Sequence, residues 1–157
     1  MVKKIEAVLL KEKPDLVIVY GDANSTLAGA LATVKQKIKL AHVEAGYRSY
    51  DRQMPEEVNR LLTDHVSDVL FAPTKTAVRN LRKEKENVEG EIYLTGDVMV
   101  DTLLKYNIMV EEKSKILNKL GILPKEYILV TVHRKSNTKD EARLGKIIAA
   151  FLKLKKS

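Results

Sequence analysis

Side chains able to do acid/base or anion chemistry follow the short apolar runs of this sequence, at the point where each run ends. These residues are Asp22, Glu44, Arg48, His133 and Arg134. The carboxyl ends of parallel strands meet at one edge of a sheet, where ligands bind. Carboxylates and imidazoles transfer protons, and guanidinium groups bind anions. The pattern therefore favours acid/base work on an anionic ligand.

The elements that must position these side chains alternate along the chain. Five apolar runs predict strands, at 16–20, 40–43, 69–72, 92–95 and 127–132. Amphipathic stretches between them predict helices, the longest over 98–120 with a break near residue 110 and a stop at Gly121. Strands separated by helices form right-handed βαβ units, so the fold class is α/β, a Rossmann-like parallel sheet flanked by helices. The continuous run 16–20 predicts a strand buried on both faces.

Composition restricts the class of protein further. Hydrophobic residues make up 45% of the 157 residues and charged residues 31%, which is typical of a folded globular chain. No apolar run reaches the roughly 18–20 residues that span a bilayer, and there is no cysteine, so we expect a cytoplasmic protein with no membrane partner. The net charge is +7, but few aromatic residues interleave with the lysines, which favours a solvated surface over nucleic-acid binding.

Several cofactor and metal signatures are missing from the sequence. There is no glycine-rich dinucleotide fingerprint and no P-loop, and the three histidines, His42, His65 and His133, are far apart. We therefore expect no cofactor and no metal.

Three motifs give a more specific signal. Residues 19–26 contain Gly-Asp-Ala-Asn-Ser, residues 42–48 read His-Val-Glu-Ala-Gly-Tyr-Arg, and residues 55–60 read Pro-Glu-Glu-Val-Asn-Arg. In this order they resemble the GD-x-N/T-S/T, HVEAG-x-R and PEE-x-NR segments of the non-hydrolysing UDP-N-acetylglucosamine 2-epimerases. Shorter matches at 71–74, 95–98 and 132–134 follow in the family's order.

The resemblance implies a two-domain architecture of the GT-B type. Residues 1–110 would be the second half of the N-terminal Rossmann-like domain, and residues 111–157 the connecting helix and the start of the C-terminal one. The family's N-terminal basic loop and its C-terminal half have no counterpart here. We therefore expect a truncated form with little activity alone, which works as a homo-oligomer or with a complementing subunit.

The resemblance also implies a reaction: conversion of UDP-N-acetylglucosamine to UDP-N-acetylmannosamine by elimination and re-addition of UDP, a step in cell-surface polysaccharide biosynthesis. It carries catalytic roles over to Asp22, Glu44, Glu56 and His133. Contacts to the substrate would come from Arg48, Arg134 and Asn137. One departure is Ser136, which stands where the family has glutamate, so we expect altered ligand contacts in that loop.

Other interpretations stay open for several of these residues. Asp22 also suits a turn and helix cap, Glu56 a partner of the helix dipole, and His42 and His65 structural hydrogen bonds. For the whole chain, the alternatives are a glycosyltransferase of the same two-domain architecture and a non-catalytic basic binding module.

Overall fold

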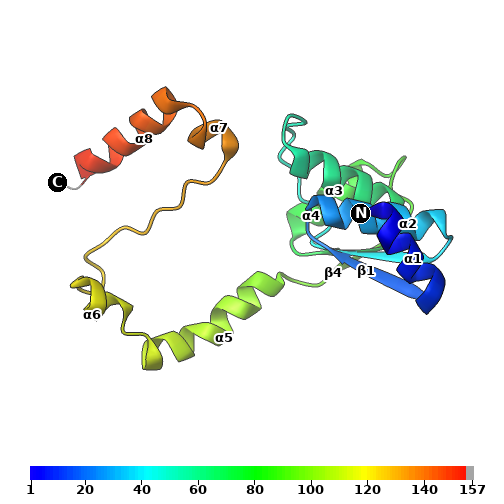
Figure 1. The fold of residues 1–157 in the computed structure, drawn as a ribbon, viewed down its shortest axis with the longest axis horizontal. Coiled ribbons are helices and arrows are strands. Elements are labelled where there is room, and N and C mark those ends of the chain that lie inside the picture. The colour runs from blue at the N-terminus through cyan, green and yellow to red at the C-terminus, as the bar shows by residue number, and fades with distance from the viewer. Residues whose placement is uncertain (155–157) are drawn as a thin grey trace. The chain divides into compact units, whose positions relative to one another are not determined.

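The computed structural model describes residues 1–154. The chain divides into two compact units, Met1–Ile108 and Met109–Ser157, and the second is described here as far as residue 154. The first unit carries a sheet covered by helices (Figure 1). The elements in chain order are α1 (Val2–Glu12), β1 (Leu16–Tyr20), α2 (Asn24–Lys35), β2 (Lys39–Val43), α3 (Pro55–Val66), β3 (Val69–Ala72), α4 (Lys75–Lys83), β4 (Glu91–Leu94), α5 (Val98–Lys113), α6 (Ile116–Leu120), α7 (Lys135–Thr138) and α8 (Glu141–Leu154). Across residues 1–154, no helix is both long enough and apolar enough to cross a membrane.

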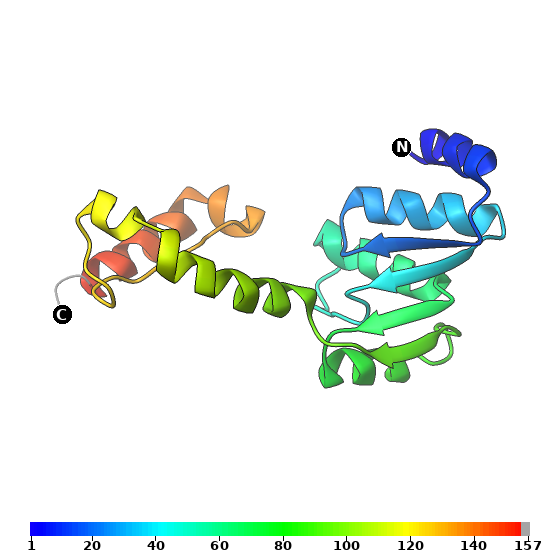
Figure 2. The same ribbon diagram turned by 90° about the horizontal axis from the view of Figure 1, so that it is seen from below.

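The sheet of the first unit is parallel, with its strands in the order β1-β2-β3-β4 (Figure 2). One register row joins Val19, His42, Leu70 and Ile92 across all four strands. A helix connects each strand to the next, as the alternating pattern of the sequence predicts. These connections are expected to be right-handed. Because the order runs in one direction, right-handed crossovers place α2, α3 and α4 on the same face, as Figure 1 shows.

The core lies between that face and its helices. Val19, Ala30 and Leu40 form one buried cluster, which joins α2 to β1 and β2. A second cluster, centred on Leu70 and Leu81, joins α4 to β3. Burial of leucine side chains of this size stabilises a fold by roughly 1.5–3 kcal/mol each. These clusters hold the strand ends, and the loops that follow them, in fixed positions.

The prediction that residues 16–20 are buried on both faces is wrong. Ile18 is 46% exposed and Tyr20 is 62% exposed, and Tyr93 on β4, in the same row as Tyr20, is 47% exposed. The reason is topological, since every crossover helix of a sheet with this strand order lies on the other face. An apolar run shows that a strand is hydrophobic, but not how many layers cover it.

The second unit begins within a long helical connection. The break predicted near residue 110 falls at residues 114–115, between α5 and α6, and Gly121 ends α6 in the left-handed conformation. The strand predicted at 127–132 is wrong, because these residues pair with no other strand and Leu129 is 83% exposed. A strand needs a neighbour to pair with, and residues 109–154 contain no other strand. The last three residues of the predicted segment 111–157 lie outside the described residues.

Candidate active site

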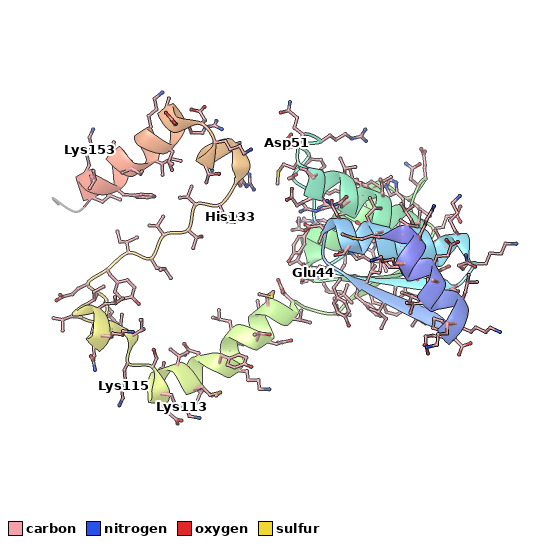
Figure 3. The ribbon with its side chains drawn as sticks, viewed as in Figure 1. Glu44, Asp51, Lys113, Lys115, His133 and Lys153 are labelled. Atoms are coloured by element: carbon pink, nitrogen blue, oxygen red, sulfur yellow. The ribbon has the colours of Figure 1, made fainter. Side chains whose placement is uncertain are left out.

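Two of the predicted catalytic carboxylates meet where β1 and β2 end. The chain turns at Gly21, whose φ is +65°, and Gly21 N donates to Val43 O at 3.1 Å, which ties the two strand ends together. Glu44 also has a positive φ, +73°, a conformation that is uncommon outside glycine. Its Oε2 lies 3.7 Å from the position that a Cβ on Gly21 would take. The Glu44 carboxylate therefore lies over the turn at Gly21, which precedes Asp22. Figure 3 marks the position of Glu44 in the first unit.

The surroundings of Glu44 favour its protonated form. Burial raises the pKa of Glu44, and the negative charges of Asp97 and Asp22 raise it further, while His42 and Arg60 act in the opposite direction. Asp97 also accepts a hydrogen bond from Tyr47 Oη at 3.0 Å. A raised pKa brings a carboxyl group closer to the pKa that suits a general acid or base.

Asp22 is held by the start of α3. Its carboxylate forms an ion pair with Arg60, and Asn59 donates from Nδ2 to the Asp22 carbonyl oxygen at 2.8 Å. The helix α2 that follows is preceded by Ala23 and has no side-chain cap, so the alternative that Asp22 caps this helix is wrong. Asp22 is available for chemistry beside a cation.

Glu56 lies in the first turn of α3, which begins at Pro55, a residue favoured at the first helical position. It precedes Asn59 by three residues and Arg60 by four, so it shares their face of the helix. Because those two residues contact Asp22, Glu56 points to the same edge of the sheet. Its side chain is exposed.

The neighbouring Glu57 has a different position, which sequence reasoning missed. It is 1% exposed and accepts hydrogen bonds from Ser49 N at 2.8 Å, Ser49 Oγ at 2.9 Å and Tyr50 N at 2.9 Å. It also pairs with Arg60 at 3.0 Å. Burial alone would raise the pKa of Glu57, but the hydrogen bonds from Ser49 and Tyr50 and the charge of Arg60 outweigh it and lower the pKa. Glu57 therefore shapes the loop between β2 and α3.

Arg48, predicted as a substrate contact, lies inside the protein. Its side chain is 1% exposed and pairs with Asp64 at 2.7 Å and with Glu84 at 2.7 Å. Burial would lower the pKa of Arg48, but the hydrogen bonds and charges of these two carboxylates raise it instead. The cation beside Asp22 is Arg60, the last residue of the PEE-x-NR motif. The motif was the only signal in the sequence that pointed to it.

The two histidines of the first unit make structural hydrogen bonds, as one interpretation of the sequence held. His42 is fully buried, with Nδ1 2.6 Å from Asp64 Oδ1 and Nε2 2.8 Å from Gly21 O. His65 Nε2 lies 3.1 Å from Glu84 Oε2. The His42 ring has no access to solvent, whereas the His65 side chain is 30% exposed.

The remaining predicted residues belong to the second unit. His133 and Arg134 lie in the segment between α6 and α7 and are exposed (Figure 3). Asn137 is half-buried in the short helix α7, and its N–H donates to Arg134 O at 2.8 Å. His133, Arg134 and Asn137 thus share one local turn, and their roles stay predictions. No group of three or more His, Cys, Asp or Glu side chains that could hold a metal occurs within residues 1–154.

Comparison with known proteins gives a consistent result. The family model described as UDP-N-acetylglucosamine 2-epimerase matches residues 1–157. A UDP-N-acetylglucosamine 2-epimerase homolog of Methanococcus maripaludis is 58% identical over 153 residues, which are 97% of this chain and 42% of that protein. The UDP-2,3-diacetamido-2,3-dideoxy-D-glucuronate 2-epimerase of Pseudomonas aeruginosa is 47% identical over 153 residues, 96% of this chain and 42% of that one.

A solved structure is similar as well. The UDP-GlcNAc 2-epimerase of Methanocaldococcus jannaschii, crystallised in complex with UDP-GlcNAc and UDP, superposes with a TM-score of 0.85 at 45% identity. The match covers 97% of this chain and 42% of that chain. The present chain therefore spans less than half the length of the relatives that it matches.

Proposed function

Because the chain belongs to the UDP-N-acetylglucosamine 2-epimerase family, we propose that it is part of an enzyme that inverts carbon 2 of a UDP-linked 2-acetamido sugar. The observation that carries this proposal is that Asp22, which pairs with Arg60, and Glu44 are close enough for their charges to interact, with Glu56 on the same helix face as Arg60. The relatives are epimerases, which favours this reaction over the glycosyltransferase and the non-catalytic basic module.

The proposed chemistry explains why several carboxylates are needed. The hydrogen on carbon 2 has no neighbouring carbonyl group, so its removal needs another source of acidity. Departure of UDP from carbon 1 develops oxocarbenium character, as in glycoside cleavage, and this acidifies the hydrogen. Elimination breaks the carbon 1–oxygen bond, moves the carbon 2 proton to a carboxylate and leaves a double bond between carbons 1 and 2. Re-addition of UDP re-forms the carbon 1–oxygen bond, while a carboxylic acid gives a proton to the opposite face of carbon 2.

Within this scheme Glu44 is suited to exchanging the proton, because burial and two neighbouring carboxylates raise its pKa. Asp22 and Glu56 would stabilise the positive charge of the sugar ring. Arg60 holds Asp22 in place. The roles of His133 near the diphosphate and of Arg134 and Asn137 as substrate contacts stay predictions of the sequence.

The substrate and the domain organisation of the chain are also proposed. UDP-N-acetylglucosamine is the first substrate to test, since the M. jannaschii relative was crystallised with it. The P. aeruginosa relative is named for a different sugar, so the sugar substituents need to be varied in that test. We propose residues 1–110 as the second half of an N-terminal domain and residues 111–157 as the connecting helix and the start of the next domain. Cytoplasmic location stays a prediction.

A homo-oligomer or complementing subunit would cover the exposed apolar residues Ile18, Tyr20 and Tyr93 on the open face of the sheet. Exposed apolar patches commonly mark interaction sites. Sedimentation velocity tests this prediction, and a strictly monomeric profile across concentrations would contradict it.

The reaction is tested by incubating the chain with UDP-N-acetylglucosamine in heavy water and following carbon 2 by NMR. We expect slow incorporation of deuterium, because the chain spans 42% of its relatives. Glu44→Gln should abolish this exchange, whereas Glu12→Gln, a change to an exposed residue of α1, should leave it unchanged. Exchange that persists in Glu44→Gln would remove Glu44 from the proposed role.

A further inference from the structure

A buried hydrogen-bond network centred on Asp64 lies next to the loop that carries Glu44. The proposed reaction assigns this network no role. At its centre is Asp64, which is 0% exposed and lies on α3. Its Oδ1 lies 2.6 Å from His42 Nδ1, and its Oδ2 accepts from Gly46 N at 3.0 Å and from Arg48 Nη1 at 2.7 Å. One carboxylate therefore contacts β2 and two points of the loop that follows it.

The hydrogen bonds of His42 determine where its protons lie. His42 Nε2 faces Gly21 O at 2.8 Å, and a backbone carbonyl can only accept, so Nε2 carries a proton. Asp64 Oδ2 accepts hydrogen bonds from Gly46 N and Arg48 Nη1, and the ion pair with the Arg48 guanidinium is the pairing of a carboxylate. An ionised carboxylate also only accepts, so Nδ1 carries a second proton. The ring is then a cation without access to solvent.

We propose that Asp64 and His42 are positioning residues, and that a doubly protonated His42 fixes the turn before Asp22 while Asp64 fixes the loop that carries Glu44. His42 binds the carbonyl oxygen of Gly21, the residue at which the chain turns just before Asp22. Asp64 holds Gly46 and Arg48, which follow Glu44. The pair thus sets the spacing of the two carboxylates. The meaning of that spacing rests on the proposed function.

The charges around His42 fit this arrangement. Asp64 faces it from α3, and Glu44 lies two residues after it, in the turn that follows β2. Arg48, which pairs with Asp64, also forms an ion pair with Glu84, so its positive charge faces two carboxylates. A cation at His42 lowers the pKa of Glu44 and opposes the effects of burial, Asp97 and Asp22 that raise it. Glu44 lies in a strained left-handed conformation, which persists in proteins only when neighbouring contacts hold it.

The first test is an NMR measurement on the ligand-free chain, which does not depend on any enzymatic activity. Long-range proton–nitrogen correlation near neutral pH should show both ring nitrogens of His42 protonated, with slow exchange against solvent. A spectrum with one unprotonated ring nitrogen would overturn the proposal. Failure of the deuterium exchange experiment, by contrast, would overturn the proposed function and leave this result unaffected.

The second test uses variants and follows the titration of the Glu44 side-chain carboxyl carbon. His42→Gln should shift this titration to higher pH, because a neighbouring cation is lost, while the control His65→Gln should not shift it. An equal response in both variants would contradict the proposal.

If His42→Gln does not fold, Asp64→Asn carries the same test. It should remove a proton from the His42 ring and disturb the Gly46 amide resonance. Asp68→Asn is the matched control, because Asp68 also accepts a backbone N–H, from Leu40 at 2.8 Å, but at the other end of the strand. An unchanged ring spectrum in Asp64→Asn would refute the pairing.

Discussion

Replacing Gly46 by alanine tests how tightly the loop that carries Glu44 is packed against α4. Gly46 has a φ of +84°, and a Cβ added there would lie 2.5 Å from Ala77 O and 2.9 Å from Leu81 Cγ. Ala77 O belongs to the backbone of a helix and cannot turn aside. The substitution therefore combines a strained backbone with overpacking.

The two effects can be given separate magnitudes. A left-handed conformation costs a non-glycine residue about 1–2 kcal/mol. Overpacking of a filled core costs about 1–3 kcal/mol. The sum for Gly46→Ala is about 2–5 kcal/mol, a large part of the roughly 5–15 kcal/mol that stabilises a typical domain. Gly96→Ala is a matched control, because its φ is +87° but no atom lies within 4 Å of the added Cβ. We expect this control to lose about 1–2 kcal/mol.

Urea unfolding followed by circular dichroism measures both variants. With a slope of about 2 kcal/mol per molar urea, Gly46→Ala should lower the midpoint by about 1–2.5 M and Gly96→Ala by about 0.5–1 M. Equal midpoints in the two variants would refute the reasoning, because they would mean that the loop moves away from Ala77 without cost. That result would also weaken the case that Glu44 is held in a fixed position.

Three further predictions concern carboxylates of the first unit. Glu57→Gln should lower the free energy of unfolding by about 1.5–3 kcal/mol, the range for hydrogen bonds to charged groups. Glu12→Gln, a change to an exposed residue, should alter it by less than about 0.5 kcal/mol. Equal losses of the two variants in chemical denaturation would contradict this prediction. Hydrogen bonding to Arg48 lowers the pKa of Glu84 below its usual value of 4.5, and hydrogen bonds outweigh burial to lower the pKa of Glu57 in the same way. The stability that these two carboxylates provide is therefore complete above pH 4.5 and is lost as the pH falls through their lower folded-state pKa values. Urea midpoints between pH 7 and pH 3 check this, and an unchanged midpoint over that range would argue against it. Burial raises the pKa of Glu44, so the free energy of unfolding falls as the pH rises from 4.5 through the folded-state pKa. Glu44→Gln removes this loss and should melt at a higher temperature than the parent at about pH 7. A lower melting temperature would count against a raised pKa.

Local features of the sequence were enough to predict most of the elements. Buried apolar runs predict β2 and β3, Pro55 predicts the start of α3, and Gly121 predicts the end of α6. These signals work because they depend on the conformational preferences of a few neighbouring residues. The order of the strands along the chain also predicts that Asp22 and Glu44 lie at the same edge of the sheet.

The tertiary structure alone decided which of these side chains face the site. Glu56 and Glu57 are adjacent in sequence, but on a helix they point about 100° apart, and only the docking of α3 shows that Glu57 turns inward to the loop. The partners of Arg48 lie 16 and 36 residues away, at Asp64 and Glu84, so no local pattern could assign this arginine to the interior. Pairing and burial depend on neighbours brought together by the fold, which is why the exposed face of β1 and the unpaired segment 127–132 also required the structure.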